Sequence, residues 1–422
     1  MKILYVSQYF PPEMGAPAAR VSELSHYWAQ EGHEVTVLTG FPNHPTGVIP
    51  PEYRGKMRRL VMRENVDGVN VVRTWLFPFP NRRASERMLN YSSFCISAAG
   101  TGVFVSRPDV LIATSPQLLV GLSGWWLARI KRVPFVFEVR DLWPESLAAV
   151  GIGNQNSVLN RSLGAVAGFL YKCSDHIAVV TPAFKDYLIQ TWGVPPEKLS
   201  VVENGVQTDL FTPDVNTIDL RRQLGAEGKF VVAYIGTMGI AHGLETLLQA
   251  AAELKKTMPN VLFLMVGEGA DKERIANRAR SQDLTNIRFV GQQAREIVPG
   301  FICASDACVV LLKKTDLFKT VIPTKMLEFM SCARPLILGV DGQARKIMDE
   351  AKAGLFVEPE NVSALVNAII RLANNPSLCE TFGRHGRDHI VKRLSRQQTA
   401  RVYISILEDV ARVGPRHSHA MA

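Results

Sequence analysis

Residues 230–269, FVVAYIGTMGIAHGLETLLQAAAELKKTMPNVLFLMVGEG, contain the pattern that decides the fold. Two apolar runs, at 230–238 and 260–269, are rich in Val, Ile, Leu and aromatic residues, as buried strands are. Between them, residues 243–257 carry apolar side chains at helical spacing. A strand, a helix and a second strand in this order predict a parallel sheet that helices cover on both faces.

The same alternation extends along most of the chain. Further strands are expected at 286–291, 307–313, 335–340 and 354–359, and in the first half at 2–8, 34–40, 70–77, 109–115, 135–141 and 176–181. We therefore expect an α/β protein with two doubly wound, Rossmann-like domains that face each other across a cleft. The expected divisions are domains at 1–205 and 206–388, a C-terminal helix at 389–413 that packs toward the first domain, and a disordered tail at 414–422.

Length and composition indicate a folded protein rather than a disordered one. The 422 residues are too many for one core, and 47% are hydrophobic while 21% are charged. The six cysteines form no CxxC pair, which favours reduced thiols in a cytosolic protein. Residues 110–128 are uncharged and almost long enough to span a bilayer. Pro116 favours instead a buried strand, a turn and a buried helix.

The formal charge of +9 is unevenly distributed, because the window from Arg54 to Arg87 alone carries +6. This window is either a solvated basic face or a surface that attracts an anionic membrane. The apolar segment at 89–105 is either a core helix or an interfacial one. The window contains no motif that reads RNA or DNA, so a nucleic-acid partner is not expected.

Glycines follow three of the expected strands, just before a helix. They lie in PPEMGAPAAR (11–20), YIGTMG (234–239) and MVGEG (265–269). Each loop is either a plain strand-to-helix turn or a place where backbone N–H groups approach an anion. None is a GxGxxG fingerprint followed by a ribose-binding acid, so a dinucleotide oxidoreductase is not supported.

Two segments place charged side chains after buried strands. In FEVRDLWPES (137–146), Arg140, Asp141 and Glu145 form either a helix-capping cluster or part of an active site. In VIPTKMLEFMSCARP (321–335), Lys325 and Glu328 lie on one helix face. They are either an exposed ion pair, or a lysine that binds a phosphate and a glutamate, one turn deeper, that binds a ribose.

Taken together, these motifs resemble the GT-B glycosyltransferases of retaining family 4. The family pattern P-[ST]-K-x-x-E has its counterparts in Pro323, Thr324, Lys325 and Glu328, with Met330 and Pro335 in register. The chain also has the interdomain Asn204-Gly205-Val206 turn and the Gly267-Glu268-Gly269 loop. RDLWPES and FPNHPTG are similar to segments of bacterial O-antigen and capsule enzymes such as N-acetyl-L-fucosamine transferases.

The resemblance implies a glycosyltransferase whose first domain binds the acceptor and whose second binds the donor. The donor is expected to be a UDP-activated deoxyamino sugar, and the acceptor a glycan on a polyprenyl diphosphate. Transfer would retain the anomeric configuration and need no metal or other cofactor. The protein is expected in the cytoplasm, in peripheral contact with the anionic inner face of the bacterial inner membrane.

The resemblance also implies roles for individual residues. Asp141, Arg140 and Lys325 are the expected catalytic residues, with His44 and Glu145 as further candidates on the acceptor side. The residues expected to bind the donor surround its diphosphate, ribose and sugar; they are Gly15, Gly236, Thr237, His242, Gly267, Glu268, Pro323, Thr324 and Glu328.

Several positions depart from the family pattern. Thr320 stands where many relatives have an acid, Thr237 and His242 where many have Arg and Lys, and Arg140 where a histidine is common. Ala333 replaces the usual helix-ending glycine, which costs about 1 kcal/mol if this residue is left-handed. Two alternatives therefore remain open: a nucleotide-sugar epimerase or hydrolase with the same fold, and a catalytically idle scaffold of a polysaccharide assembly complex.

Overall fold

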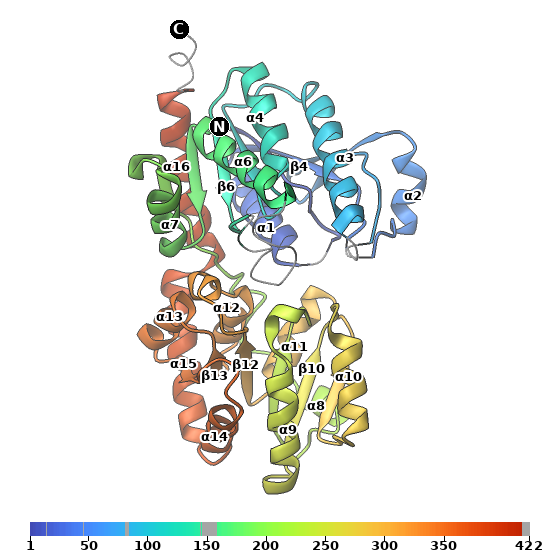
Figure 1. The fold of residues 1–422 in the computed structure, drawn as a ribbon, viewed down its shortest axis with the longest axis vertical. Coiled ribbons are helices and arrows are strands. Elements are labelled where there is room, and N and C mark those ends of the chain that lie inside the picture. Colours follow the sequence, from blue (N-terminus) through green and yellow to red (C-terminus); the bar gives the residue numbers. More distant parts are fainter. Residues whose placement is uncertain (14, 45, 81–83, 144, 146–157, 416–422) are drawn as a thin grey trace. The chain divides into compact units, whose positions relative to one another are not determined.

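The computed structural model describes residues 1–415 except 14, 45, 81–83, 144 and 146–157, and it divides into two compact units (Figure 1). Unit 1 comprises Met1–Asn204 and Gln397–Ala422, and unit 2 comprises Gly205–Arg396. Each unit is a Rossmann-like fold on a mainly parallel sheet, so the predicted fold class is confirmed. Most of the tail expected at 414–422 lies outside the described residues.

Within the described residues, unit 1 contains an eight-stranded sheet with the order β3-β4-β2-β1-β5-β6-β7-β8. All neighbouring strands run parallel except β3 and β4. Their apolar side chains alternate between two covered faces, which explains the continuous apolar runs. The strands are β1 (Lys2–Val6), β2 (Glu34–Gly40), β3 (Val61–Val66), β4 (Val69–Thr74), β5 (Val110–Thr114), β6 (Phe135–Val139), β7 (His176–Val179) and β8 (Leu199–Val201).

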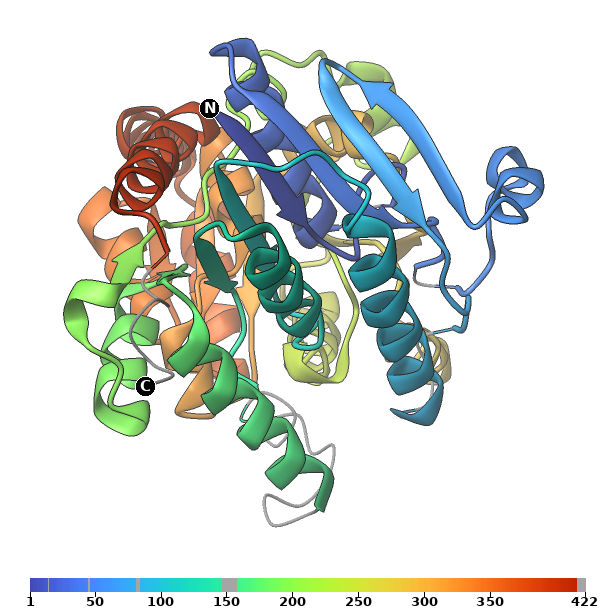
Figure 2. The ribbon, with the colours of Figure 1, turned by 90° about the horizontal axis from the view of Figure 1, so that it is seen from above.

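Helices cover both faces of this sheet. On one face α1 (Ala16–Gln30) and α16 (Arg396–Val413) pack on residues such as Ile3 and Val37. On the other face α3 (Ala84–Gly102), α4 (Val120–Lys131) and α6 (Val158–Cys173) lie side by side (Figure 2). The other helices among the described residues of unit 1 are α2 (Pro51–Met57), α7 (Pro182–Trp192) and the 3-10 turn η1 (Pro196–Lys198).

Strand β3 is an element that the sequence analysis missed. It lies inside the basic window and forms a hairpin with β4 through Asp67 and Gly68, which both have positive φ. An Asp-Gly pair between two strands is a recognised signal for such a two-residue turn. The hairpin also corrects our view of the window as one exposed face: Arg73 on β4 is fully buried and forms an ion pair with Glu64 on β3.

Within the described residues, unit 2 contains a six-stranded parallel sheet with the order β11-β10-β9-β12-β13-β14. One face is covered by α9, α10 and α14, and the other by α11, α12, α13 and α15. The strands are β9 (Phe230–Ile235), β10 (Val261–Val266), β11 (Ile287–Val290), β12 (Ala307–Leu311), β13 (Leu336–Gly339) and β14 (Gly354–Phe356). The helices are α8 (Ile218–Gln223), α9 (Glu245–Thr257), α10 (Lys272–Ser281), α11 (Val298–Cys303), α12 (Thr324–Ser331), α13 (Gln343–Ala351), α14 (Val362–Ala373) and α15 (Pro376–Arg393), with the turns η2 (Ile240–His242), η3 (Arg295–Ile297) and η4 (Leu317–Thr320).

The C-terminal region forms two helices where one was expected at 389–413. Helix α15 belongs to unit 2, whereas α16 lies almost entirely in unit 1. The indole N–H of Trp28 on α1 donates a hydrogen bond of 3.0 Å to the carbonyl of Ala400, and its ring lies 5.5 Å from that of Tyr403. The last helix is therefore part of the core of unit 1.

The apolar segments that suggested membrane contact form elements of unit 1, and Leu89, Ile96 and Trp126 remain exposed on them. Residues 110–128 form β5 and the first part of α4, and residues 89–102 belong to α3. Across the described portion of the chain, we find no helix with the combined length and apolar character that crossing a bilayer requires.

Candidate active site

Lys325 lies in the first turn of α12, directly after Pro323 and Thr324. Pro323 is the N-cap residue, one position before the first turn in which it was expected. The Lys325 ammonium donates a hydrogen bond of 2.9 Å to the hydroxyl of Tyr234 and lies 4.1 Å from the centre of that ring. Tyr234 is on β9, so a partner 91 positions away in the sequence holds the lysine at the carboxyl end of the sheet.

The surroundings of Lys325 disfavour its charge. Burial lowers the pKa of this lysine to about 7, and the carboxylate of Glu328 only partly opposes the shift. A half-buried ammonium without a full counter-charge is strongly stabilised by an incoming anion. This environment favours an anion site over an exposed ion pair.

Glu328 points to a different partner. Its carboxylate forms an ion pair of 3.1 Å with Arg295 of η3, whose guanidinium stacks on the ring of Phe211 at 5.0 Å. Arg295 is a residue that the sequence analysis missed, because nothing near it marks it as part of a site. The predicted contact of Glu328 with a ribose remains a prediction, and Arg295 would fix the orientation of that carboxylate.

The loop after β9 lies against Lys325. The Tyr234 hydroxyl donates a hydrogen bond of 2.6 Å to the carbonyl of Thr237, so the tyrosine links the lysine to this loop. Gly236 has a φ of 132°, and a Cβ atom there would lie 3.2 Å from the Lys325 Nζ. The glycine therefore leaves room for the lysine as well as for a strained turn.

The glycines of the 267–269 loop allow two backbones to touch. A Cβ on Gly267 would lie 2.2 Å from the carbonyl oxygen of Gly236, and one on Gly269 would lie 2.3 Å from that of Met238. The Met238 N–H donates a hydrogen bond of 2.8 Å to the carbonyl of Glu268. The Glu268 side chain pairs with Lys272. The loops after β9 and β10 thus support each other beside Lys325.

His242 supplies no positive charge at neutral pH. It ends η2, and its ring centre lies 6.0 Å from that of Tyr234. Burial, and after it the nearby Lys325 ammonium, lower the pKa of His242 to about 3. Its predicted contact with the donor would therefore be made by a neutral imidazole.

In unit 1, Arg140 lies against the start of α1. Its backbone N–H donates a hydrogen bond of 2.7 Å to the hydroxyl of Ser115. Its guanidinium donates to the carbonyls of Ala16 at 3.2 Å and Pro17 at 3.5 Å. Gly15 is the N-cap residue of this helix, with a φ of 126°. The structure thus brings two of the predicted residues, Arg140 and Gly15, to one end of α1.

The carboxylates of the same segment contact neighbouring aromatic residues. Asp141 accepts a hydrogen bond of 3.2 Å from the indole N–H of Trp143. Glu145 accepts one of 2.6 Å from the hydroxyl of Tyr187 on α7. His44, the other acceptor candidate, packs edge-to-face on Tyr9 at 5.0 Å, and burial lowers its pKa.

A buried network beside these residues was also missed. Arg20 on α1 forms an ion pair of 2.9 Å with Glu138, which also accepts a hydrogen bond of 2.7 Å from the Tyr5 hydroxyl. Arg20 donates further hydrogen bonds to Val202 and Asn204, where the chain leaves unit 1. The available signal was Glu138 itself, since a charge inside the apolar strand FVFEV requires a buried partner.

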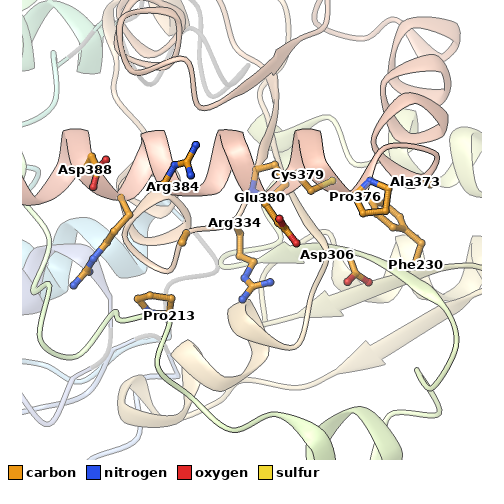
Figure 3. A pocket seen from close by; sticks show the side chains of 13 residues that line it. Pro213, Phe230, Asp306, Arg334, Ala373, Pro376, Cys379, Glu380, Arg384 and Asp388 are labelled. Carbon is orange, nitrogen blue, oxygen red and sulfur yellow. The ribbon is translucent and has the colours of Figure 1, made fainter.

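A cavity of about 560 Å³ lies elsewhere in unit 2, between the amino ends of β9, β12 and β13 and helix α15 (Figure 3). It is lined by residues such as Phe230, Asp306, Arg334 and Glu380, and none of its described lining residues belongs to the predicted site. Ligands of open α/β sheets bind at the opposite, carboxyl end of the strands. Among the described residues, no cluster of three or more His, Cys, Asp or Glu side chains could hold a metal ion.

Comparisons with known proteins match both units to families. Residues 15–205 match a family model described as a glycosyl transferase 4-like domain, and residues 216–389 match one described as glycosyl transferases group 1. The chain is 23% identical over 416 residues to the putative colanic acid biosynthesis glycosyl transferase WcaI of Escherichia coli K12, covering 96% of this chain and 99% of that protein.

Solved structures share the fold. A sucrose-phosphate synthase from Thermosynechococcus elongatus has a TM-score of 0.77 at 20% identity, with 98% of this chain and 100% of that one covered. The Anabaena protein HepE, in complex with UDP, has a TM-score of 0.71 at 17% identity, with 97% and 100% covered.

Proposed function

The chain belongs to the GT-B glycosyltransferases, with a glycosyl transferase 4-like domain followed by a group 1 domain, and on this premise we propose which transfer it catalyses. The proposed reaction moves a sugar from a nucleotide-diphosphate donor to a lipid-linked glycan during surface polysaccharide synthesis. The donor sugar is a deoxyamino sugar carried by UDP, and its anomeric configuration is retained. A relative described as a putative colanic acid biosynthesis enzyme supports the role in polysaccharide synthesis, and a structural neighbour in complex with UDP supports the choice of nucleotide.

The observation that carries the proposal is the environment of Lys325. Its ammonium lies beside Tyr234 and Gly236 at the carboxyl end of β9, at the start of an eight-residue helix. The helix start adds free N–H groups and the positive end of a dipole. Together these groups would bind the diphosphate of the donor.

The same groups would act in the chemical step. As the bond between sugar and diphosphate breaks, negative charge grows on the leaving oxygen, and preorganised positive charge stabilises it. A diphosphate at Lys325 restores the lysine charge that burial disfavours, so the binding of the donor and the protonation of Lys325 are coupled. On the acceptor side, Asp141 and Arg140 are the proposed positioning groups, with His44 and Glu145 as further candidates.

A lipid-linked acceptor would bring the protein to the inner face of the membrane, and unit 1 has a surface suited to it. We call this surface the α2 rim; it consists of the exposed basic residues of α2 and the turn after it together with two exposed apolar side chains. Leu60 and Phe77 are 59% and 46% exposed. Trp75 connects them: its backbone N–H donates a hydrogen bond to the Leu60 carbonyl, and its ring lies 4.5 Å from that of Phe77. The basic residues of the α2 rim are Arg54, Lys56, Arg58 and Arg59.

Binding of nucleotide sugars to the purified chain tests the proposal. A donor that binds the folded state raises the apparent melting temperature. We expect UDP and a UDP-linked deoxyamino sugar to raise it more than GDP or ADP do. Incubation of that donor with a polyprenyl-diphosphate-linked glycan should then yield an elongated glycan with the donor's anomeric configuration. Binding without transfer to any lipid-linked acceptor would support an idle scaffold, and donor turnover without acceptor would support an epimerase or hydrolase.

A further inference from the structure

A buried carboxylate that the proposed chemistry does not use lies in the loop after β1. Glu13 is only 7% exposed. Its Oε1 accepts hydrogen bonds of 2.9 Å from the backbone N–H groups of both Asn43 and His44, and its Oε2 accepts one of 3.4 Å from Phe10. One side chain therefore joins the loop after β1 to the loop after β2.

The loop that Glu13 holds carries groups able to meet a ligand. The half-buried imidazole of His44 packs on the ring of Tyr9, which is also half-buried. The hydroxyl of Tyr9 lies 3.5 Å from that of Tyr91 on α3. The side chain of Asn43 accepts a hydrogen bond of 3.0 Å from Asn90, also on α3.

A second layer of amides lies behind these groups. The Gln8 side chain donates to the Asn90 Oδ1 and accepts a hydrogen bond of 2.9 Å from Gln117. The loops after β1 and β2 are thus connected to α3 by hydrogen bonds, at the carboxyl edge of the sheet. Aromatic faces, hydroxyls and neutral amides are the groups that recognise a hydroxyl-rich sugar, since they bond to hydroxyls without demanding a charge.

We propose that Glu13 is a positioning residue of the acceptor site, where it fixes the His44 loop so that His44 and Tyr9 contact a sugar unit of the acceptor glycan. This inference rests on the proposed glycosyl transfer and deepens it. Glu13 acts through the two backbone N–H groups that it binds, and it does not itself touch the acceptor.

A glutamine could accept the same hydrogen bonds, so the choice of a carboxylate has a consequence. Burial raises the pKa of Glu13 to about 7, although its three N–H donors and the Arg73 guanidinium act in the opposite direction. Three charged or titratable side chains lie around Glu13. Arg73 pairs with Glu64, burial lowers the pKa of His44, and Tyr9 is close enough to Arg87 to feel its charge.

The direction of the pH effect follows from linkage. A Glu13 released into solvent has an ordinary pKa near 4.5, whereas in the closed loop it binds its proton up to about pH 7. Between these values the open loop binds fewer protons than the closed one, so rising pH favours opening. The loop should therefore be tightest at acidic pH and should loosen until the pH passes about 7.

Hydrogen exchange of the full chain, followed by mass spectrometry on the peptide 41–48, tests the positioning role. After correction for the intrinsic exchange rate, the wild-type peptide should exchange faster at pH 8 than at pH 6. Glu13→Ala should speed exchange at both pH values, because it removes the acceptor. Glu13→Gln should slow exchange of this peptide at pH 8 compared with the wild type. It should also abolish the pH dependence, because it keeps a hydrogen-bond acceptor that cannot become charged.

A matched control is Glu34→Gln, which alters an exposed carboxylate at the amino end of β2 and should leave the peptide unchanged. Exchange in Glu13→Ala equal to that of the wild type would overturn the inference. So would a Glu13→Gln variant that keeps the wild-type pH dependence.

Steady-state kinetics separate this inference from the proposed function. In Glu13→Ala the KM for the lipid-linked acceptor should rise about tenfold, because a displaced loop loses its preorganised contacts, while the KM for the donor stays the same. Glu13→Gln should restore the acceptor KM. Equal rises in both KM values would overturn the positioning role. If the wild-type chain transfers no sugar, the proposed function is wrong, and so is the role of Glu13 in acceptor binding. The exchange data would then report only whether Glu13 holds the loop.

Discussion

At the scale of single residues, this protein keeps ionisable side chains where their charge is disfavoured. Lys325 and Glu13 both lie in loops or first turns at the carboxyl edge of a sheet, and burial moves the pKa of each to about 7. Such groups lower stability compared with neutral side chains of similar shape, and they cluster at functional sites because binding and catalysis need shifted pKa values. The chemistry of each depends on what binds beside it.

Lys325→Ala should lower turnover by about 100-fold, because it removes preorganised positive charge from the leaving group. Arg58 is the exposed C-cap residue of α2. Arg58→Ala should change turnover with a water-soluble acceptor by less than about twofold. Transfer assays with saturating donor measure both values. Equal losses in the two variants would contradict the assignment of Lys325.

The affinity for UDP should depend on pH through Lys325. Its pKa of about 7 in the free protein rises when a diphosphate binds, so binding takes up a proton above pH 7. Affinity should therefore fall as pH rises from 7 to 9, by at most about tenfold per pH unit. Calorimetry in buffers of different ionisation enthalpy measures the proton uptake. Lys325→Met should bind more weakly and without this uptake.

Ala333 shows that a predicted strain is present. Ala333 follows Cys332, the C-cap residue of α12, and has a φ of 53°, the left-handed conformation that glycine adopts more easily. Ala333→Gly should therefore raise the free energy of unfolding by up to about 1 kcal/mol. Urea denaturation measures it, and Ala353→Gly, at a buried position in the same unit, should instead lower stability.

At the scale of elements, two loops and a short helix together form the proposed donor side of unit 2. The loops after β9 and β10 touch backbone to backbone, and α12 presents Lys325 to the first of them. The loops contain glycine where a side chain would separate them. These glycines allow the two loops to pack together, and this packing in turn shapes the proposed binding site.

Gly267→Ala should disturb both loops, because its Cβ would overlap the Gly236 carbonyl and its φ of 135° is strained for alanine. We expect a loss of about 2 kcal/mol or more in stability and a weaker UDP affinity. Gly228→Ala is the matched control, with a φ of 68° but open space around it. It should cost about 1 kcal/mol and leave UDP binding unchanged. Similar UDP affinity in both variants would contradict the role of the loop contact.

At the scale of the whole molecule, the chain crosses between the units twice, and its last helix completes the first unit. Val206 and Ser395, near the two crossings, form a β-bridge within unit 2. Helix α16 then buries Tyr403 and Leu407 in the core of unit 1. The stability of unit 1 therefore depends on helix α16.

Leu407→Ala should lower the stability of unit 1 by about 2–5 kcal/mol, since it leaves a cavity beside a fully buried core. Val402, on the same helix, is 43% exposed, and Val402→Ala should change stability by less than about 0.5 kcal/mol. Denaturant unfolding followed by hydrogen exchange assigns each loss to a unit. A Leu407→Ala loss confined to unit 2 would be inconsistent with this packing.

Membrane contact through the α2 rim is a further prediction for the whole molecule. Reversing two charges with Arg58→Glu and Arg59→Glu should reduce binding to phosphatidylglycerol vesicles by at least about 30-fold, at about 1 kcal/mol per basic residue. High salt should also weaken binding of the wild-type protein to these vesicles, because it screens the charges. Vesicle co-sedimentation measures both effects, with phosphatidylcholine vesicles for comparison. Phe104→Ser, an 80% exposed position near the amino end of β5, serves as control and should bind normally. If vesicle binding is lost in the Phe104 variant and kept in the charge-reversal variant, the membrane contact lies near Phe104 and not at the α2 rim.

What the sequence by itself determined is the class of fold and the places where chemistry can occur. Apolar runs separated by amphipathic helices specify parallel sheets, because both faces of each strand must be covered. The strand ends then mark the loops that hold Gly15 and Arg140 and the helix start that holds Lys325. A one-dimensional pattern suffices here, since periodicity and turn residues are local properties. Even the missed strand β3 had a local signal in Asp67-Gly68.

Only the tertiary structure decided the state of the ionisable groups. Tyr234 stands 91 positions before Lys325, and Arg20 stands 118 positions before Glu138. Glu13 owes its burial to the loop after the next strand. Desolvation and pairing depend on which atoms surround a charge, and those atoms come from distant parts of the chain. The sequence could therefore name Lys325 as a candidate, but only the fold surrounds it with the groups that lower its pKa.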